Sequence, residues 1–323
     1  MSEFSLINCY FSAIGKRKED VVLGIGDDAA IVNVENKKRL VVSVDTFIEG
    51  VHFPAATAAY NVGWKSLAVN LSDMAAMGAT PLWVTLAITL PEKNASWLAE
   101  FSRGFNELAT CYDVALIGGD TTRGPLSVTV NIIGEVECET QLLRSNASPG
   151  DKIYVSGFLG DAALGLKSLT EQLPISDSEK LYLQHELNRP LPRLKEALAL
   201  KSTISAAIDI SDGLDADLKH ILNTSDVGAK ISVQQLPVSR EYRWCCNGPQ
   251  SFDVALTGGD DYELCVTVSA DNEAMFLKLA AETELRWSCI GEITEGETLS
   301  YVNSNDEIYT VNKQAYDHFQ VDS

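Results

Sequence analysis

The stretch KSLAVNLSDMAAMGATPLWVTLAITL, residues 65–90, places a helical pattern directly before a strand pattern. Its first half belongs to a helix that we expect from about residue 58 to 77, because Gly78 and Pro81 are signals that end helices. Its second half, PLWVTLAITL, is an apolar run with β-branched residues, which predicts a strand. A helix and a strand in direct succession indicate an α/β layer.

The same alternation runs through the rest of the chain. In the first half we expect two or three strands between 21 and 53, a helix over 96–111 with Ser96 as a possible cap, a strand end at VALIGGD (114–120) and a strand at 126–136. In the second half we expect a strand at 152–157, a helix at 161–169, two helices across 177–201, a strand at 206–210, a helix from Asp212, strands on either side of GGDDY (258–262), a helix near 273–283 and a short strand before the tail. The polar segment SNASPGD (145–151) indicates a domain boundary. We therefore expect an α/β (α+β) fold with two domains, 1–145 and 146–323, each a mixed sheet with helices packed on it.

Composition excludes several classes of function. The formal charge is -20, with 25 Lys and Arg against 45 Asp and Glu, which argues against nucleic acid as a partner. No apolar run is long enough to cross a membrane, and the first twenty residues lack the apolar core of a signal peptide. The seven cysteines form no CxxC pair, which favours a reducing, cytoplasmic compartment. An anionic substrate would then need a bound divalent cation to receive it.

Acidic residues recur where apolar runs end or are interrupted. A buried carboxylate costs several kcal/mol unless it is paired or coordinates a metal, and few basic residues lie near these motifs. Hard oxygen ligands suit Mg²⁺, which is commonly shared between carboxylates and nucleotide phosphates. The acids are Asp27 and Asp28 in GIGDDAA, Asp45 in VVSVDTF, Asp73 in NLSDMAAMG, Asp120 in LIGGDTT, Asp209 and Asp212 in AIDISDGL, and Asp260 and Asp261 in LTGGDDYEL.

Each of these motifs has a simpler explanation when it is taken alone. An isolated Gly-Gly-Asp is more often a turn than a site, and Ser211-Asp212-Gly213 is a good helix N-cap. The recurrence favours a site, because turns would accept Asn or Ser equally well. Gly-Gly-Asp also follows an apolar run twice, at 118–120 and 258–260, which suggests one local device in both halves. The sequence contains no GxxxxGK[ST], no protein-kinase motif set and no GxSxG.

Taken in order, the motifs resemble those of the thiamine-monophosphate kinases, in the superfamily that includes aminoimidazole ribonucleotide synthetase. The resemblance rests on LGIGDDAA, SVDTFIEGVHF, KSLAVNLSDMAAMGA, LIGGDTTRGPLSVTV, IDISDGL, GGDDYEL and AYDHF, and it covers nearly the whole chain. It implies phosphoryl transfer from ATP to thiamine monophosphate with several Mg²⁺ ions, the last step of thiamine diphosphate biosynthesis. It also implies a homodimer joined through N-terminal sheets, an ATP- and metal-binding first domain, and a second domain that completes the active site.

The resemblance implies roles for individual residues. Metal ligation falls to Asp28, Ser43, Asp45, Asp73, Asp120, Asp209 and Asp212; ATP contacts to Gly119, Asp120, Arg144 and Ser211; and thiamine phosphate contacts to His52, Asp260 and Tyr316. No general base is expected, because the acceptor phosphate is already charged at neutral pH. The sequence departs from the family at Val44, where a hydroxyl residue is usual, and at Asp260, where Glu is usual.

Other interpretations stay open on the sequence alone. A related enzyme such as the purine-pathway synthetase would use ATP and metal with a different acceptor, and a non-catalytic metal- or nucleotide-binding protein could use the same acids. Single residues have structural alternatives as well: a lone His52 after a strand is often structural, and an aromatic residue such as Tyr316 near a C-terminus usually packs. Asp27, next to Asp28, is expected to cap or orient its loop.

Overall fold

The computed structural model of the chain describes residues 9–11, 14–15, 18–23, 31–32, 34, 37–138, 140–248 and 250–312. The chain splits into two compact units: unit 1 is Met1–Met74 with Ala79–Gln141, and unit 2 is Ala75–Gly78 with Leu142–Ser323. The expected boundary between residues 145 and 146 lies a few residues after this division. It stays a prediction, as do the separate roles given to the two domains.

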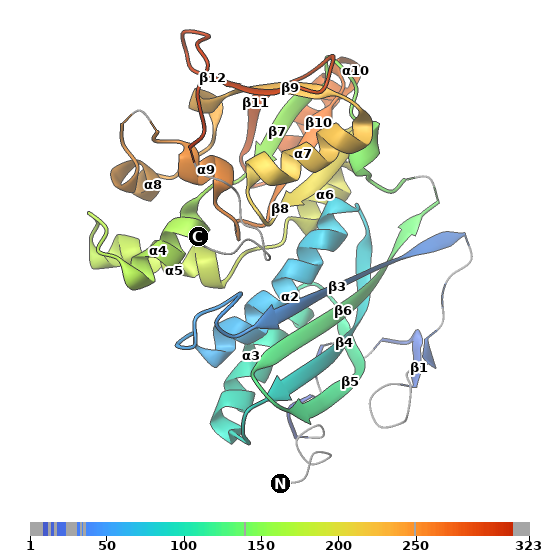
Figure 1. Cartoon of the computed structure of the whole chain (residues 1–323). Coiled ribbons are helices and arrows are strands. Elements are labelled where there is room, and N and C mark those ends of the chain that lie inside the picture. Colours follow the sequence, from blue (N-terminus) through green and yellow to red (C-terminus); the bar gives the residue numbers. More distant parts are fainter. Residues whose placement is uncertain are drawn as a thin grey trace. The chain divides into compact units, whose positions relative to one another are not determined.

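Unit 1 is built on a mixed four-stranded sheet in the order β3-β6-β4-β5 (Figure 1). Strand β4 pairs in parallel with β5 and antiparallel with β6, which pairs antiparallel with β3. A separate antiparallel pair is formed by β1 and β2. The elements are β1 Val21–Leu23, β2 Ile31–Val32, β3 Lys38–Ile48, α2 Ala59–Ala76, β4 Thr80–Leu90, α3 Ala95–Cys111, β5 Ala115–Arg123 and β6 Ser127–Glu137.

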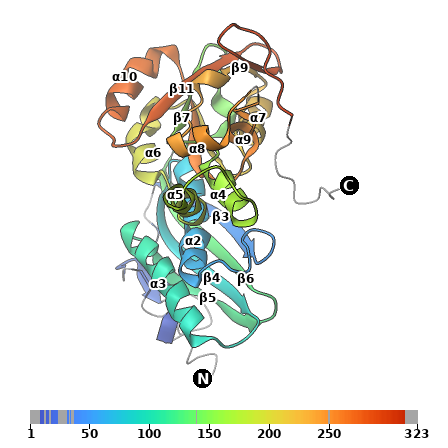
Figure 2. The same cartoon turned by 90° about the vertical axis from the view of Figure 1, so that its left-hand side faces the viewer.

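One face of this sheet is covered by α2 and α3 (Figure 2). The opposite face carries a row of exposed apolar side chains on β3. Alternate residues of β6, including Val128, Val130 and Ile132, are fully buried on the helical side. Successive side chains of a strand point to opposite faces, so the β3 residues that pair with the other row of β6 lie on the opposite face, where they are exposed. This row consists of Leu40, Val42, Val44 and Ile48, which are 48%, 59%, 58% and 37% exposed.

Helix α3 begins with an N-cap that differs from the expected one. The Asn94 side-chain oxygen accepts a hydrogen bond from the Trp97 N–H, so Asn94 is the cap. The prediction of Ser96 is wrong: its hydroxyl donates to the Asn94 oxygen at 2.8 Å. Asn and Ser are comparably good caps, and the helix takes the one placed just before its first turn.

Unit 2 contains a mixed six-stranded sheet in the order β12-β9-β11-β7-β10-β8, in which only β12 and β9 among the described neighbours pair in parallel. Its strands are β7 Lys152–Ser156, β8 Ala206–Ile210, β9 Gly228–Ser232, β10 Glu263–Val268, β11 Trp287–Thr294 and β12 Leu299–Val302. Its helices are α4 Asp161–Thr170, α5 Asp177–Asn188, α6 Leu194–Leu200, α7 Leu214–Ser225, α8 Arg240–Cys245, α9 Asp253–Thr257 and α10 Ala270–Ala280, with short 3₁₀ turns at Arg144–Asn146, Lys201–Thr203 and Val233–Gln235. The expected α/β fold with two mixed sheets is confirmed.

Helices cover both faces of the sheet in unit 2. Leu214, Leu218 and Ile221 of α7 pack with Ile208 and Val155 in the main core of this unit. On the other face, the ring of Phe276 from α10 lies 4.7 Å from the Tyr154 ring and 5.5 Å from the Trp287 ring, measured between centroids. Strands β7, β8 and β10 are therefore almost completely buried, which fits the apolar residues that make up most of their sequences.

Three further expectations about local structure are wrong. The residues before GGDDY form helix α9 and not a strand. The two Gly-Gly-Asp segments therefore differ in local structure, because the first lies inside strand β5 and the second follows a helix. Asp120 lies inside β5, which continues to Arg123, so VALIGGD does not end a strand. Helix α7 begins at Leu214 with Gly213 as its N-cap residue, two residues after the expected start at Asp212.

The described part of the chain has no helix long and apolar enough to cross a membrane. All seven cysteines are free thiols.

Candidate functional site

In unit 2, the pairing of β8 with β10 brings together two segments that the sequence singled out. Asp209 is the register partner of Leu264. Beyond the strand ends the pairing continues through backbone hydrogen bonds, from the Tyr262 N–H to the Ile210 oxygen and from the Asp260 N–H to the Ser211 oxygen, each 2.8 Å long. Segments 209–212 and 258–262 are thus joined at one end of the sheet.

The close approach of these segments depends on glycine. A Cβ atom added at Gly259 would lie 2.5 Å from the Ser211 carbonyl oxygen. Gly213 has φ = 106°, and a Cβ there would lie 2.8 Å from the Thr257 carbonyl carbon. The glycines in SDG and GGDDY therefore serve as contact points between the two backbones.

The loop that carries Asp260 is held in a strained conformation. Asp260 and Tyr262 have φ values of 72° and 50°, in the left-handed region that non-glycine residues seldom adopt. The Tyr262 hydroxyl donates to an Asp260 carboxylate oxygen at 3.2 Å, which orients that carboxylate. Strain of this kind costs on the order of 1–3 kcal/mol per residue and concentrates at functional sites.

Asp217 lies beneath the SDG segment and was not among the predicted site residues. Its Oδ2 accepts hydrogen bonds from the backbone N–H groups of Ser211 and Asp212, both at 3.0 Å. Burial raises the pKa of the Asp217 carboxyl to about 7, and the charges of Asp209 and Asp212 act in the same direction. An acid on the apolar face of a predicted helix, beside Leu214 and Leu218, is a sequence signal that could have identified it.

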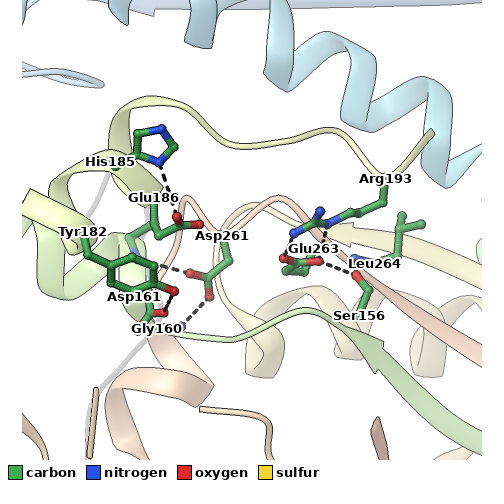
Figure 3. Close-up of polar contacts among 11 residues, drawn as sticks. Ser156, Gly160, Asp161, Tyr182, His185, Glu186, Arg193, Asp261, Glu263 and Leu264 are labelled. Carbon is green, nitrogen blue, oxygen red and sulfur yellow. Dashed lines mark hydrogen bonds and ion pairs between the residues drawn. The ribbon is translucent and has the colours of Figure 1, made fainter. Parts of the chain in front are cut away.

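Asp261, the second acid of GGDDY, has a structural role that differs from that of its neighbour (Figure 3). Its carboxylate accepts hydrogen bonds from the Gly160 N–H at 2.7 Å and the Ala162 N–H at 3.4 Å, so it caps α4. Burial raises the pKa of Asp261 well above its usual range. Nearby, Asp161 accepts from the Ser239 hydroxyl at 2.6 Å and the Tyr182 hydroxyl at 3.0 Å, and burial raises its pKa to about 6.

Glu263 follows in a buried ion pair that fixes the start of β10 (Figure 3). Its Oε2 accepts from the Ser156 hydroxyl at 2.5 Å and from Arg193 Nε at 2.7 Å, and Arg193 Nη2 contacts its Oε1. Arg193, Glu263 and Asp261 line a cavity of about 270 Å³ together with Phe158 and Arg286. Neither Arg193 nor Glu263 was predicted as a site residue.

In unit 1, β3 and α2 bring Ser43 and Asp73 together. The Ser43 hydroxyl donates to Asp73 Oδ2 at 2.5 Å. Asp45 lies two residues further along β3 and therefore on the same face of the sheet as Ser43. These three predicted metal ligands share the helix-covered face.

His52 is oriented by the backbone just after β3. Its Nδ1 accepts a hydrogen bond from the Ile48 N–H at 3.0 Å, and its ring stacks on Phe47 at 5.5 Å between centroids. Because an accepting Nδ1 places the proton on Nε2, Nε2 is the ring atom that can donate to a ligand. Lys65, which is only 4% exposed, holds its Nζ 5.8 Å from the centroid of Phe47, and it was not among the predicted site residues.

Asp120 is not brought to this group within one chain. In the sheet register Asp45 pairs with Val130, whereas Asp120 pairs with Ala87 in the neighbouring row, which points to the opposite face. Strands β3 and β5 are three strand spacings apart, roughly 14 Å. Gly119 has φ = 155°, and a Cβ there would lie 1.9 Å from the Leu86 oxygen, so only glycine fits.

Arg144 begins a 3₁₀ turn in unit 2, where its carbonyl oxygen accepts from the Ser225 hydroxyl at 2.8 Å. Asp27, Asp28 and Tyr316 lie outside the described residues.

The predicted metal ligands are all oxygen donors, which fits Mg²⁺ by chemistry. Among the described residues, however, no three His, Cys, Asp or Glu side chains are grouped so that they could hold a metal ion. The ligand set is distributed over both units, with Ser43, Asp45, Asp73 and Asp120 in unit 1 and Asp209 and Asp212 in unit 2.

Comparison with known families defines the class of protein. Residues 26–136 match the model of the AIR synthase related protein, N-terminal domain, and residues 148–302 match that of the AIR synthase related protein, C-terminal domain. The two matches cover most of the chain and correspond to a two-domain protein of this type.

Comparison with individual proteins identifies the family within this class. The thiamine-monophosphate kinase of Escherichia coli K12 is 44% identical over 319 residues, 98% of each chain. The crystal structure of thiamine-monophosphate kinase from Stenotrophomonas maltophilia K279a aligns with a TM-score of 0.83 and 45% identity, covering 88% of this chain and 92% of that one. The structure of AaThiL complexed with AMPPCP and TMP aligns with a TM-score of 0.78 and 30% identity, covering 89% of each. The chain belongs to the thiamine-monophosphate kinase family, as the motif resemblance implies.

Proposed function

We propose that this protein transfers the γ-phosphoryl group of ATP to thiamine monophosphate, forming thiamine diphosphate and ADP. The proposal is carried by full-length similarity to thiamine-monophosphate kinases at 44% identity. It is supported by the hydrogen-bonded junction of the SDG and GGDDY segments, which places three predicted contact residues, Asp212, Ser211 and Asp260, on adjoining backbones.

The chemistry requires alignment and charge neutralisation more than proton transfer. The acceptor phosphate has a second pKa of about 6, so its attacking oxygen is already charged at neutral pH. In the proposed mechanism, Gly119, Arg144 and Ser211 bind the nucleotide, and His52 donates from Nε2 to the acceptor. The Asp260 carboxylate, held by Tyr262, contacts the thiamine part of the acceptor.

The proposed Mg²⁺ ligands are Asp28, Ser43, Asp45, Asp73, Asp120, Asp209 and Asp212. When bound, Mg²⁺ would neutralise the two phosphate groups and stabilise the charge of the transferred phosphoryl group. In this proposal the Ser43–Asp73 hydrogen bond holds two of the donors beside each other, on the face that also carries Asp45.

We also propose a homodimer formed through the sheets of unit 1. The apolar stripe consists of exposed side chains on the sheet face opposite α2 and α3: Leu40, Val42, Val44 and Ile48. A two-fold interface places the same patch of both copies together, so an apolar stripe can cover its own equivalent. The protein is proposed to be cytoplasmic, which agrees with seven free thiols.

The test is a product assay with purified protein, ATP, Mg²⁺ and thiamine monophosphate, in which ADP and thiamine diphosphate are both measured. Asp45→Asn removes a proposed ligand at nearly constant volume. Asp306→Asn is the matched control, because Asp306 is a surface residue with a 72% exposed side chain.

Equal amounts of the two products from the wild type and the control, with almost none from Asp45→Asn, would support the proposal. ADP without thiamine diphosphate would refute the acceptor, and turnover of another acceptor would point to a different enzyme of the superfamily. Tight Mg²⁺-dependent nucleotide binding without turnover would indicate a non-catalytic protein.

A further inference from the structure

The SDG segment has no regular secondary structure, yet its backbone is held from two sides. The Ile210 and Ser211 carbonyl oxygens accept hydrogen bonds from Tyr262 and Asp260. The Ser211 and Asp212 N–H groups, which point the other way, donate to Asp217 Oδ2. Four consecutive backbone groups, from the Ile210 C=O at the end of β8 to the Asp212 N–H, are therefore fixed by partners outside the SDG segment.

Asp217 is well placed to act as a rigid support. It lies in the first turns of α7 and is 3% exposed. The helix itself is anchored by Leu214, Leu218 and Ile221 in the core of unit 2. One carboxylate oxygen thus fixes the irregular SDG segment to a helix that is itself held in the core.

We propose that Asp217 is a positioning residue, whose two hydrogen bonds from the Ser211 and Asp212 N–H groups set the places of the Ser211 hydroxyl and the Asp212 carboxylate for the Mg²⁺-nucleotide. This inference rests on the proposed function for the identity of the nucleotide. The Ser211 carbonyl oxygen also accepts a hydrogen bond from the Asp260 N–H, so the position of Ser211 also affects the segment proposed to bind the acceptor.

Three variants separate this role from general stabilisation. Asp217→Leu keeps the branching of the side chain but replaces both carboxylate oxygens with methyl groups, so no acceptor is left. Asp217→Asn keeps an oxygen that can accept from both N–H groups. Asp215→Asn is the matched control, because Asp215 lies in the same helical turn but contacts Tyr301 and Lys219, each at 2.7 Å, and not the SDG segment.

The first measurement is hydrogen exchange of the Ser211 and Asp212 amides without any substrate. In the wild type both amides should exchange slowly. Exchange should become at least about tenfold faster in Asp217→Leu and remain slow in the other two variants, while the β8 amides stay protected. Rapid exchange of Ser211 and Asp212 in the wild type would overturn the proposal even if Asp217→Leu does not fold.

The second measurement is steady-state kinetics. The KM for Mg²⁺-ATP should rise about 10- to 100-fold in Asp217→Leu, the range seen when residues that orient metal ligands are removed. Asp217→Asn should restore the KM, and Asp215→Asn should leave it unchanged. An unchanged KM in folded Asp217→Leu, or equal damage from Asp217→Asn, would contradict positioning through these hydrogen bonds. If the wild type makes no thiamine diphosphate, the proposed function fails, and the exchange data still decide the role of Asp217.

Discussion

The ion pair between Arg193 and Glu263 offers a sharp test of the energetics of unit 2. The Glu263 side chain is 6% exposed and that of Arg193 is 18% exposed, so the pair is largely withdrawn from water. The variant Arg193→Met keeps much of the apolar stem of the arginine but removes both of its hydrogen bonds. Within the described part of the chain, Glu263 then retains the Ser156 hydroxyl as its side-chain hydrogen-bond partner.

Two estimates of the cost agree. Hydrogen bonds to charged groups contribute about 1.5–3 kcal/mol each, so the loss of two corresponds to about 3–6 kcal/mol. Breaking a buried ion pair by removing one partner costs about 3–5 kcal/mol, because the remaining charge is left uncompensated. We expect the unfolding free energy of unit 2 to fall by about 3–5 kcal/mol in Arg193→Met.

Hydrogen exchange of the β10 amides measures this quantity, because these amides are in a buried strand and report the opening of unit 2. Lys152→Met is the control. It breaks a 2.9 Å pair with Glu292 in the same sheet, but both side chains are well exposed, at 38% and 48%, so the cost should stay below about 1 kcal/mol.

The double variant Arg193→Met with Glu263→Leu should recover much of the stability, because replacing both members of a buried pair with apolar residues is often nearly neutral. A loss below about 1 kcal/mol in Arg193→Met would refute the reasoning. A double variant that is less stable than the single variant would also contradict it.

Three further predictions concern other parts of the molecule. The folded-state pKa of Asp161, about 6, is above its unfolded value of 3.8, so the contribution of this carboxyl to stability is lost as the pH rises from about 4 to about 6. Urea titrations of the wild type and Asp161→Asn measure this loss: the unfolding free energy of the variant relative to the wild type should rise by about 3 kcal/mol over that window. A difference that does not change with pH would contradict the prediction. Val44→Glu should convert the proposed dimer into a monomer in sedimentation velocity, because it places a charge at a 58% exposed position of the apolar row; an unchanged sedimentation coefficient would exclude this face. Gly259→Ala should lower kcat/KM by at least about tenfold, since its Cβ would lie 2.5 Å from the Ser211 oxygen, and normal kinetics would show that the two segments can separate without cost.

Local patterns were sufficient for most of the fold. The helix expected over 58–77 is α2, and the apolar run after it is β4, because Gly78 and Pro81 act within a few residues of the helix end. The failures occurred where two local choices had similar energies. Asn94 and Ser96 are both good caps, and the short apolar run before GGDDY suits either a strand or helix α9.

For the candidate site, too, some features could be predicted from the sequence and others only from the structure. The sequence by itself determined the family and the set of acids, because the motifs occur in a fixed order along the chain. The resemblance assigned Asp260 and not Asp261 to the substrate, but only the tertiary structure showed what Asp261 does: it caps α4 through Gly160, a residue 101 positions away, while the Asp260 N–H donates to the Ser211 carbonyl oxygen. Likewise, Asp120 and Asp45 read as one set in sequence, but sheet register separates them onto neighbouring rows and distant strands. The physical reason is that hydrogen-bond partners and strand order are fixed by long-range packing, which leaves no local pattern in the chain.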